Sequence, residues 1–246
     1  MTAAGTPRPP VALITGASRG LGAVLARFLV NQGFAVILNA RGSPALEALA
    51  EELRRGGHDV ESVAGDVSEG RTQTALRAAV DRLGRLDLLV NNASELGPAP
   101  LPSLVEYPPG KLEGVFRVNV IAPLSLIQEL LPPLRASQGR VVNISSDAAL
   151  GGYPGWGGYG ASKAALDLLS LTLAHELSDA GVSVVSVDPG HMRTSLHQAA
   201  YPGQDISDRP MPEVTVPFWA WLLNQPGSLV SGHRFQAQAD RWQVPV

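Results

Sequence analysis

Short apolar runs alternate with longer amphipathic segments along most of this chain, and this alternation constrains the fold more than any other feature. In the first amphipathic segment, residues 21–29, apolar side chains recur at intervals of three and four, which predicts a helix with one buried face. Apolar runs of strand length are typical of parallel strands that helices cover on both sides. The predicted strands are residues 11–15, 34–39, 60–64, 86–91, 140–145 and 182–187.

Helical patterns fill the gaps between these strands, and weaker patterns follow the last of them. We therefore predict an α/β fold, a single doubly wound, Rossmann-type, three-layer sandwich with a mostly parallel central sheet of about seven strands. No linker divides the chain, so residues 1–246 are expected to form one domain with a flexible leader over residues 1–10. The glycine-rich stretch 151–160 predicts a mobile loop. Further helices are expected over residues 44–55, 72–83, 103–134 with a kink at Pro123, 160–180 and 213–224, and a last strand near 233–237.

Composition excludes several classes of function. The net charge is −3 and the nineteen basic residues are scattered, so we expect no nucleic-acid partner. No run approaches the ~18 consecutive apolar residues of a spanning helix, and the first residues lack a signal-peptide pattern, which favours a cytoplasmic protein without a membrane partner. The sequence has no cysteine, and the spacing of His191 and His197 does not suit a helical ligand pair, so we expect no metal site.

A glycine-rich segment, residues 15–22, joins the first predicted strand to the first helix. Its sequence, TGASRGLG, lets the backbone turn sharply and approach a pyrophosphate. The free N–H groups and the positive dipole end at the start of the helix favour such an anion. The spacing is G-x-x-x-G-x-G rather than the general G-x-G-x-x-G, and an ordinary glycine-rich turn is the alternative interpretation.

Charge near the end of the second strand indicates which dinucleotide would bind. In dinucleotide folds an acid about 20 residues beyond the glycines usually holds the adenosine ribose, whereas an arginine accommodates a 2′-phosphate. No acid occurs here before Glu47, but Arg41 follows the strand and Arg19 lies in the glycine-rich turn. Two guanidinium groups can bind a phosphate together, so the sequence favours NADP(H) over NAD(H). The alternative is that Arg41 is a solvated residue at a strand end.

Tyr159 and Lys163 stand four residues apart at the start of a predicted helix, where they share one face. The chain has only two lysines, Lys111 and Lys163, so chance explains this pair poorly. A nearby ammonium favours phenolate, and we expect it to lower the pKa of the tyrosine toward a range useful for acid–base chemistry. Ser146 follows the fifth predicted strand at the same sheet edge, where its hydroxyl can bind a substrate carbonyl oxygen. An ordinary turn serine is the alternative.

With these residues identified, the chain resembles the short-chain dehydrogenase/reductase family over nearly its whole length. The combination of motifs is specific to that family and covers both the nucleotide end and the chemical end of the predicted site. The matching motifs are Thr15 to Gly22, Asp66-Val67, Asn91-Asn92-Ala93, Asn119, Ser146, Tyr159-x-x-x-Lys163, Pro189-Gly190 and Thr194.

The resemblance implies a role for each matched residue. Tyr159 would be the general acid in carbonyl reduction, Ser146 would polarise the carbonyl, and Lys163 would bind the nicotinamide ribose and lower the pKa of Tyr159. Asn119 would hold a proton-relay water. Members of the family commonly pair their long fifth and sixth helices into homodimers or homotetramers. The expected cofactor contacts are Thr15, Gly16, Ser18, Arg19, Gly20, Leu21, Gly22, Arg41, Asp66, Val67, Asn92, Ala93, Tyr159, Lys163, Pro189, Gly190 and Thr194.

The sequence also departs from the family pattern. The family's NNAG ends in Ser94 here, which adds a Cβ and a hydroxyl and is expected to shift the local backbone slightly. Residues 191–212 are expected to form a compact, partly open substrate lid. Asp147, directly after Ser146, either orients an amine or hydroxyl of the substrate or is a solvated loop carboxylate. A largely apolar, partly aromatic substrate pocket is expected from Leu96, Tyr153, Trp156, His191, Met192 and His197. Packing of these residues within the loops is the alternative.

We therefore predict an NADP(H)-dependent oxidoreductase that interconverts a carbonyl group, as ketone or aldehyde, and an alcohol on a small, partly apolar substrate. A nicotinamide-binding sensor without turnover is the alternative, although a sensor does not need a positioned Ser146, Tyr159 and Lys163. An epimerase or dehydratase of the extended relatives would need a larger C-terminal domain than the 58 residues that follow Asp188.

Overall fold

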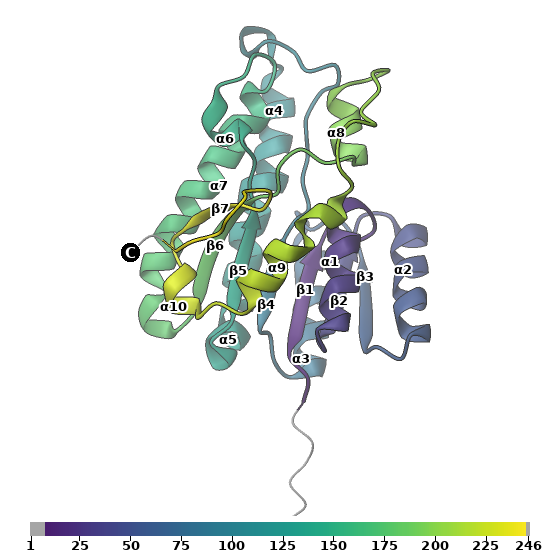
Figure 1. The fold of residues 1–246 in the computed structure, drawn as a ribbon, viewed down its shortest axis with the longest axis vertical. Helices are drawn as coiled ribbons and strands as arrows, with labels where there is room; N and C mark the ends of the chain where they lie inside the picture. The colour runs from purple at the N-terminus through teal and green to yellow at the C-terminus, as the bar shows by residue number, and fades with distance from the viewer. Residues whose placement is uncertain (1–7, 245–246) are drawn as a thin grey trace, which may run out of the picture.

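The computed structural model describes residues 8–244, and these form one seven-stranded sheet with helices on both faces (Figure 1). Neighbouring strands pair in parallel in the order β3-β2-β1-β4-β5-β6-β7, which confirms the predicted Rossmann-type fold. Of the predicted leader, residues 1–7 lie outside the described part of the chain. The strands are β1 (Val11–Thr15), β2 (Ala35–Ala40), β3 (Val60–Ala64), β4 (Leu88–Asn91), β5 (Arg140–Ile144), β6 (Ser183–Asp188) and β7 (Arg234–Gln236).

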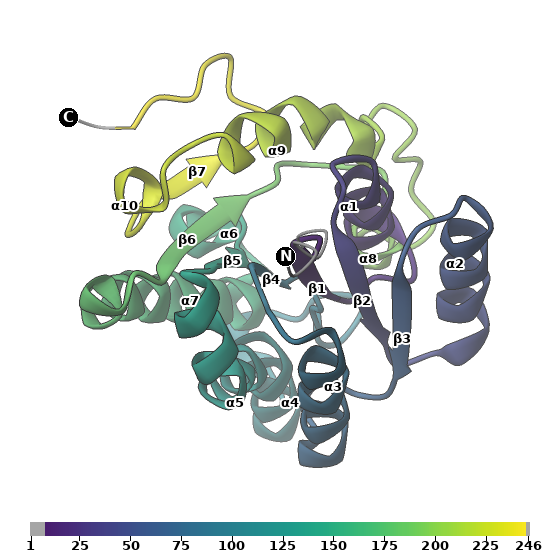
Figure 2. The ribbon, with the colours of Figure 1, turned by 90° about the horizontal axis from the view of Figure 1, so that it is seen from below.

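The helices cover the sheet in two groups (Figure 2). One face carries α1 (Gly20–Asn31), α2 (Ser43–Arg55) and α9 (Val216–Leu223), and the other carries α3 (Gly70–Leu83), α5 (Ala122–Ser137) and α7 (Gly157–Glu176). The shorter helices are α4 (Pro109–Phe116), α6 (Ala148–Gly151), α8 (Ser195–Ala200) and α10 (Gly227–Val230), with single helical turns at Leu104–Glu106, Ser178–Ala180 and Pro212–Thr215.

The strands at the centre of the sheet contribute to two cores, because successive side chains point to opposite faces. In β1, Ala12 and Ile14 pack on the α1 side, whereas Val11 and Leu13 pack on the α3 side. All four are nearly inaccessible to solvent. Burying an aliphatic side chain of this size contributes roughly 1.5–3 kcal/mol to stability. The continuous apolar runs seen in the sequence are therefore the strands of a sheet that is buried on both faces.

The helix predicted over residues 103–134 is continuous from Pro109 to Ser137, and the predicted kink at Pro123 stays a prediction. Pro123 lies inside this helical stretch, where it lacks the N–H that would bind the main chain one turn earlier. An irregularity falls just before Pro123, where residues Arg117–Ile121 form a π-helical turn between α4 and α5. Such turns displace the side chains that they carry and often occur at functional sites. Here the turn carries Asn119.

The glycine-rich stretch 151–160 is also more ordered than predicted, since α7 already begins at Gly157. The glycines of this first turn permit close packing. A Cβ on Gly158 would lie 2.5 Å from the ring of Tyr107, and one on Gly160 would lie 2.5 Å from the main-chain oxygen of Ala148. The prediction of a mobile loop over the whole stretch is therefore wrong, because close contacts rather than mobility account for these glycines.

By length and composition alone, the helical stretch Pro109–Ser137 could cross a membrane. In this fold the stretch packs against α3 and α7, and 44% of its most apolar window is buried inside the protein. Core helices of soluble proteins pass the same test, so the finding is weak evidence for a membrane span.

An aromatic cluster joins α9 to β7 and to the end of the described chain. Phe218 lies at its centre, with ring centroids of Trp219 and Trp242 at 5.0 and 5.6 Å. Trp221 contacts Phe235 at 5.4 Å and Trp242 at 6.0 Å. This cluster extends the core on the α1 side of the sheet and holds α9 against β7.

Candidate active site

A cavity of about 780 Å³ opens at the carboxyl edge of the sheet. It is lined by the loops that follow β1 to β6 and by the segment around α8. The strand order reverses between β1 and β4, and the carboxyl side of such a switch point is where open α/β sheets bind ligands. The topology therefore brings the two ends of the predicted site, far apart in sequence, to one crevice.

The glycine-rich turn forms the floor of the cavity at its nucleotide end. Gly16 and Gly20 have φ angles of +64° and +55°, in the left-handed region that favours glycine. A Cβ on Gly16 would lie 2.9 Å from the Cα of Ala93, and one on Gly22 would lie 2.4 Å from the main-chain oxygen of Gly16. Helix α1 starts at Gly20, so its free N–H groups face this end of the cavity. The cradle fits a pyrophosphate.

Hydrogen bonds tie the ends of β1 and β4 together beneath this cradle. The Oγ1 of Thr15 accepts hydrogen bonds from the main-chain N–H groups of Asn92 and Ala93, each at 3.0 Å. The side-chain amide of Asn92 donates to the main-chain oxygens of Thr15 and Gly16. Of the predicted cofactor contacts, Thr15 and Gly22 do not line the cavity, and they support the loops that do.

The end of the cavity beside β2, where the sequence predicts the adenosine end, carries two arginines, Arg19 and Arg41. Arg41 directly follows β2 and is 61% exposed, and its Nη1 lies 3.3 Å from the carboxylate of Glu95. Asp66 accepts two hydrogen bonds from Ser68 and lines the same end. Where other dinucleotide folds place a ribose-binding acid at the end of β2, this chain presents cations. The other predicted cofactor residues that line the cavity are Gly16, Ser18, Gly20, Leu21, Val67, Asn92, Ala93, Tyr159, Lys163, Pro189, Gly190 and Thr194.

Tyr159, Lys163 and Ser146 meet at the other end of the cavity. Tyr159 lies in the first turn of α7 and Lys163 one turn later, with the ammonium nitrogen 5.5 Å from the centre of the phenol ring. Lys163 is only 2% exposed, and its Nζ donates a 2.7 Å hydrogen bond to the main-chain oxygen of Ile144. Ser146 follows two residues after that oxygen. The structure thus brings together the three residues that the sequence assigned to acid–base chemistry.

Burial shifts the pKa values of both Tyr159 and Lys163. It raises the pKa of Tyr159 to about 12, while the hydroxyls of Ser94 and Ser146 oppose that rise and the carboxylates of Asp188 and Asp147 add to it. The pKa of Tyr159 is therefore raised, not lowered as the sequence suggested, because burial outweighs any opposite effect of Lys163. Burial also lowers the pKa of Lys163 to about 8, although the charge of Asp167 acts in the opposite direction.

The side chain of Asn119 does not line the cavity and is fully hydrogen-bonded. Its Oδ1 accepts from Ser94 Oγ and from the N–H of Glu95, and its Nδ2 donates to the main-chain oxygen of Glu95 and to Ser162 Oγ. Two acceptor and two donor positions are all that an amide side chain has. Asn119 thus fixes the segment after β4 against α7, and the water-holding role implied by the family resemblance stays a prediction.

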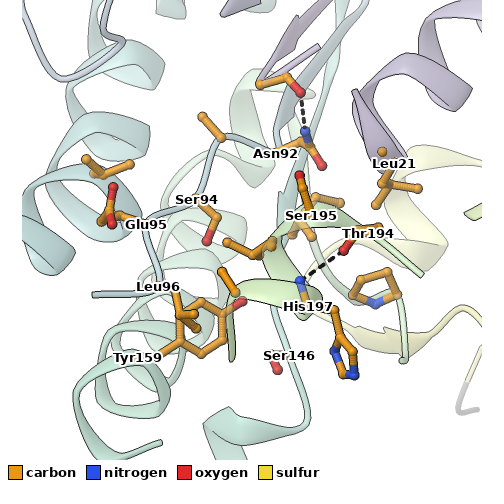
Figure 3. A pocket seen from close by; sticks show the side chains of 18 of the residues that line it. Leu21, Asn92, Ser94, Glu95, Leu96, Ser146, Tyr159, Thr194, Ser195 and His197 are labelled. Carbon is orange, nitrogen blue, oxygen red and sulfur yellow. Dashed lines mark hydrogen bonds between the residues drawn. The ribbon is translucent and has the colours of Figure 1, made fainter. Parts of the chain in front are cut away.

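Ser94 has a more direct place in the site than the sequence suggested. Its side chain projects toward Tyr159 from the segment after β4, and Ser146 lies on the far side of the phenol oxygen (Figure 3). The Oγ of Ser94 also lies 3.3 Å from Asn119 Oδ1. The sequence had indicated only a small backbone change at this position. The serine at position 94, where the family motif has glycine, was the feature of the sequence that could have indicated this role.

Arg234 supports the site from β7 and was not found by sequence reasoning. Its guanidinium donates to the main-chain oxygen of Ser146 at 2.8 Å and to the carboxylates of Asp188 at 3.2 Å and Asp167 at 3.0 Å. These three partners lie after β5, at the end of β6 and on α7. One arginine therefore fixes three elements of the catalytic end relative to one another.

An aromatic wall encloses the substrate end. Ring contacts run from Tyr159 to Trp156 at 5.7 Å, on to Tyr201 at 6.2 Å, then to His197 at 5.1 Å and to His191 at 5.3 Å. The sequence had not indicated Tyr201, which lies within the predicted lid. The predicted substrate residues Leu96, Tyr153, Trp156, His191, Met192 and His197 all line the cavity. Within residues 8–244, no cluster of three or more His, Asp or Glu side chains is arranged to hold a metal.

The fold and the site together define an oxidoreductase of the Rossmann type. The sequence pattern of the short chain dehydrogenases matches residues 10–205. The chain belongs to the short-chain dehydrogenase family.

Three known proteins illustrate this similarity. A serine 3-dehydrogenase from Agrobacterium fabrum is 39% identical over 199 residues, which is 80% of this chain and 78% of that protein. A 3-oxoacyl-[acyl-carrier-protein] reductase of rhamnolipid biosynthesis from Pseudomonas aeruginosa is 36% identical over 86% of this chain and 83% of its own length. A short chain dehydrogenase from Shigella flexneri, solved in complex with NADP, superposes with a TM-score of 0.86 at 29% identity, covering 94% of this chain and 97% of that one.

Proposed function

We propose that this protein is an NADP(H)-dependent oxidoreductase that interconverts a carbonyl group and an alcohol on a small, partly apolar substrate. The observation that carries the proposal is the meeting of Ser146, Tyr159 and Lys163 at one end of a cavity whose other end is a glycine cradle. A bound nicotinamide supplies a hydride donor or acceptor there, which amino-acid side chains cannot provide.

The chain's own residues bind, orient and exchange the proton. Tyr159 donates its phenol proton to the carbonyl oxygen in reduction and accepts the alcohol proton in oxidation. Ser146 donates a hydrogen bond to the same oxygen and so stabilises the negative charge that develops on it. Lys163 has three N–H donors, of which one binds Ile144, so two remain for the ribose hydroxyls and for stabilising phenolate.

Preference for NADP(H) is proposed from the charges around the adenosine end. Arg19 and Arg41 both line it, and β2 ends in Ala40 rather than in an acid. Arg41 already pairs with Glu95 at 3.3 Å, but both side chains are substantially exposed, so a phosphate can compete for the guanidinium at little cost. The NADP complex of the Shigella flexneri relative supports the same preference.

The proposed activity is tested by following nicotinamide absorbance with NADPH and a panel of ketones and aldehydes. Turnover of at least one carbonyl compound is expected. Failure of every substrate, together with tight NADPH binding, would instead favour the sensor without turnover. The named relatives point to two substrate chemistries, since one acts on serine and the other on a 3-oxoacyl carrier protein. The panel therefore includes amino-substituted and acyl-thioester carbonyl compounds.

We further propose that the chain is a single domain in which residues 191–212 form a substrate lid, and that the protein is cytoplasmic.

We also propose that the protein is a homo-oligomer. Ile121 in the π-helical turn and Leu168 on the adjacent α7 are 58% and 66% exposed, which suits an apolar contact between copies. Light scattering during size-exclusion chromatography measures the mass, for which a dimer or tetramer is expected. A monomer at micromolar concentration would contradict this proposal.

A further inference from the structure

Asp147 occupies a distinctive place in the cavity wall at the substrate end. Its Oδ1 accepts a 3.0 Å hydrogen bond from Ser146 Oγ, and its Oδ2 lies 3.2 Å from Nε2 of His191. The side chain is 34% exposed, so it faces the cavity and is not sealed in the core. Tyr153, the next aromatic residue along the chain, also borders the cavity there.

At the Tyr159 end of the cavity, Asp147 lacks the arginine partner that Asp188 has. Four carboxylates line the cavity. Glu95 pairs with Arg41, Asp188 pairs with Arg234, and Asp66 lies at the adenosine end. Among residues 8–244, Asp147 has no arginine or lysine within salt-bridge distance, and its ionisable partners are His191, which is half exposed, and the phenol of Tyr153. Hydrogen bonds from Ser146 and His191 outweigh the effect of burial and keep the pKa of Asp147 low, so the group is a carboxylate at neutral pH.

The contact with Ser146 creates a conflict with the proposed function. A serine hydroxyl has a single proton to donate. In this structure Ser146 donates it to Asp147, while the N–H of Ala148 donates to Ser146. Asp147 therefore competes with a substrate carbonyl oxygen for this proton. A group that satisfies Asp147 in place of Ser146 would release that proton for the reacting oxygen.

The surroundings favour a cation as that group. The aromatic wall from Trp156 through Tyr201 to His197 and His191 leads to Asp147, so a ligand held there meets aromatic rings as well as a carboxylate. A carboxylate and aromatic rings together bind ammonium groups well. A neutral hydroxyl would leave the charge of Asp147 without a counter-charge.

We propose that Asp147 binds an ammonium group on the substrate carbon next to the reacting carbon, so that the substrates are vicinal amino alcohols and the corresponding α-amino carbonyl compounds. Ser146 and Asp147 are hydrogen-bonded to each other, so the groups that they bind must be close neighbours. A vicinal nitrogen and oxygen in a gauche arrangement satisfy this requirement. The ammonium keeps all its bonds in the reaction, and its role is to orient the substrate and to free the Ser146 hydroxyl. This inference rests on the proposed alcohol–carbonyl activity.

The decisive experiment compares two alcohols of nearly equal shape, 1-amino-2-propanol and 2-butanol, with NADP⁺. Wild type is expected to prefer the amino alcohol at least tenfold in kcat/KM, because a charge-assisted hydrogen bond is lost with 2-butanol. Asp147→Asn is expected to reduce this ratio at least tenfold, and Asp147→Glu to retain more of it. Asp81→Asn, on the exposed surface of α3, serves as the matched control and should keep the wild-type ratio.

A binding measurement separates this inference from the proposed function. Calorimetry with n-propylammonium chloride requires no turnover. The affinity of the protein for n-propylammonium is expected to fall at least fivefold in Asp147→Asn but not in Asp81→Asn. A wild-type ratio near one, or a ratio and an affinity unchanged by Asp147→Asn, overturns the ammonium site even if 2-butanol is oxidised. Asp147-dependent binding without oxidation of either alcohol supports the ammonium site and counts against the proposed activity.

Discussion

The ammonium nitrogen of Lys163 is hydrogen-bonded across 2.7 Å to the main-chain oxygen of Ile144, which joins helix α7 to the end of strand β5. This bond fixes a buried cation beside Tyr159, at the end of the cavity opposite the glycine cradle. Burial makes the charge of Lys163 costly in solvation free energy and so lowers the pKa of the ammonium.

Removal of this ammonium is expected to change how stability depends on pH. The folded pKa of Lys163 is about 8, below its ordinary value of about 10.4, so between these values the unfolded chain binds a proton that the folded protein lacks. Stability attributable to Lys163 therefore rises with pH over this window, by up to about 3 kcal/mol. Urea unfolding of wild type and Lys163→Met at pH 7.5 and 10 measures it. A stability difference between the two proteins that is the same at both pH values would contradict the expectation.

Tyr159→Phe removes the proposed proton donor while it keeps the ring. Turnover is expected to fall by about 10² or more, because general acid–base catalysis typically contributes 10²–10⁴. NADPH affinity, measured by calorimetry, is expected to change little, since the glycine cradle and the arginines are untouched. Full turnover in the variant would remove Tyr159 from the mechanism.

Ser94→Ala is expected to shift the pH profile of alcohol oxidation upward. The Ser94 hydroxyl opposes the rise in the pKa of Tyr159, so its loss leaves that pKa higher. Oxidation needs the phenolate form, and its rate then increases only at higher pH. The measurement is kcat/KM against pH for wild type, Ser94→Ala and the control Ser125→Ala, whose hydroxyl donates to Gln73 on α3. A profile in Ser94→Ala identical to that of the control would show that the hydroxyl is not coupled to the phenol.

Arg41→Asp is expected to reverse the preference between the two dinucleotides. The substitution replaces a cation by an acid at the end of β2, which repels a 2′-phosphate and can bind ribose hydroxyls instead. The ratio of kcat/KM for NADPH to that for NADH should fall by about tenfold or more. Arg71→Asp is the control, because the side chain of Arg71 is exposed at the start of α3. A wild-type enzyme that prefers NADH would contradict the proposed preference for NADP(H).

Arg234→Met is expected to lower both stability and activity. It leaves the carboxylates of Asp167 and Asp188 without their guanidinium partner, and breaking such a buried pair costs roughly 3 kcal/mol. The hydrogen bond to the main chain at Ser146 is lost as well. Thermal unfolding and kcat, compared with Arg71→Met, measure the two effects. Arg234 acts through these neighbours, so NADPH affinity should fall less than kcat.

Local patterns in the sequence predicted the sheet, the cradle and the acid–base residues, because each depends on residues close together along the chain. Apolar residues repeat every second position along a strand and every third or fourth position along a helix, so their spacing indicates the element and its buried face. The start of α7 was misplaced, since Gly158 and Gly160 serve contacts with Tyr107 and Ala148 that only the folded chain reveals.

The remaining features depend on tertiary contacts. The pKa of Tyr159 follows from burial, which adjacent residues such as Lys163 do not reveal. The full hydrogen bonding of Asn119 requires partners from β4's loop and from α7, far away in sequence. Arg234 gave no signal, because a single arginine in a three-residue strand has no pattern of its own.

The grouping of Trp219, Trp221 and Trp242 around Phe218 has a practical consequence for spectroscopy. The sequence has four tryptophans, and the remaining one, Trp156, stands in the cavity wall beside Tyr159. Intrinsic fluorescence therefore has two separate origins. Emission from the group reports whether the last described residues remain seated on α9, and the difference between wild type and Trp156→Phe isolates a single emitter that senses the arrival of ligands.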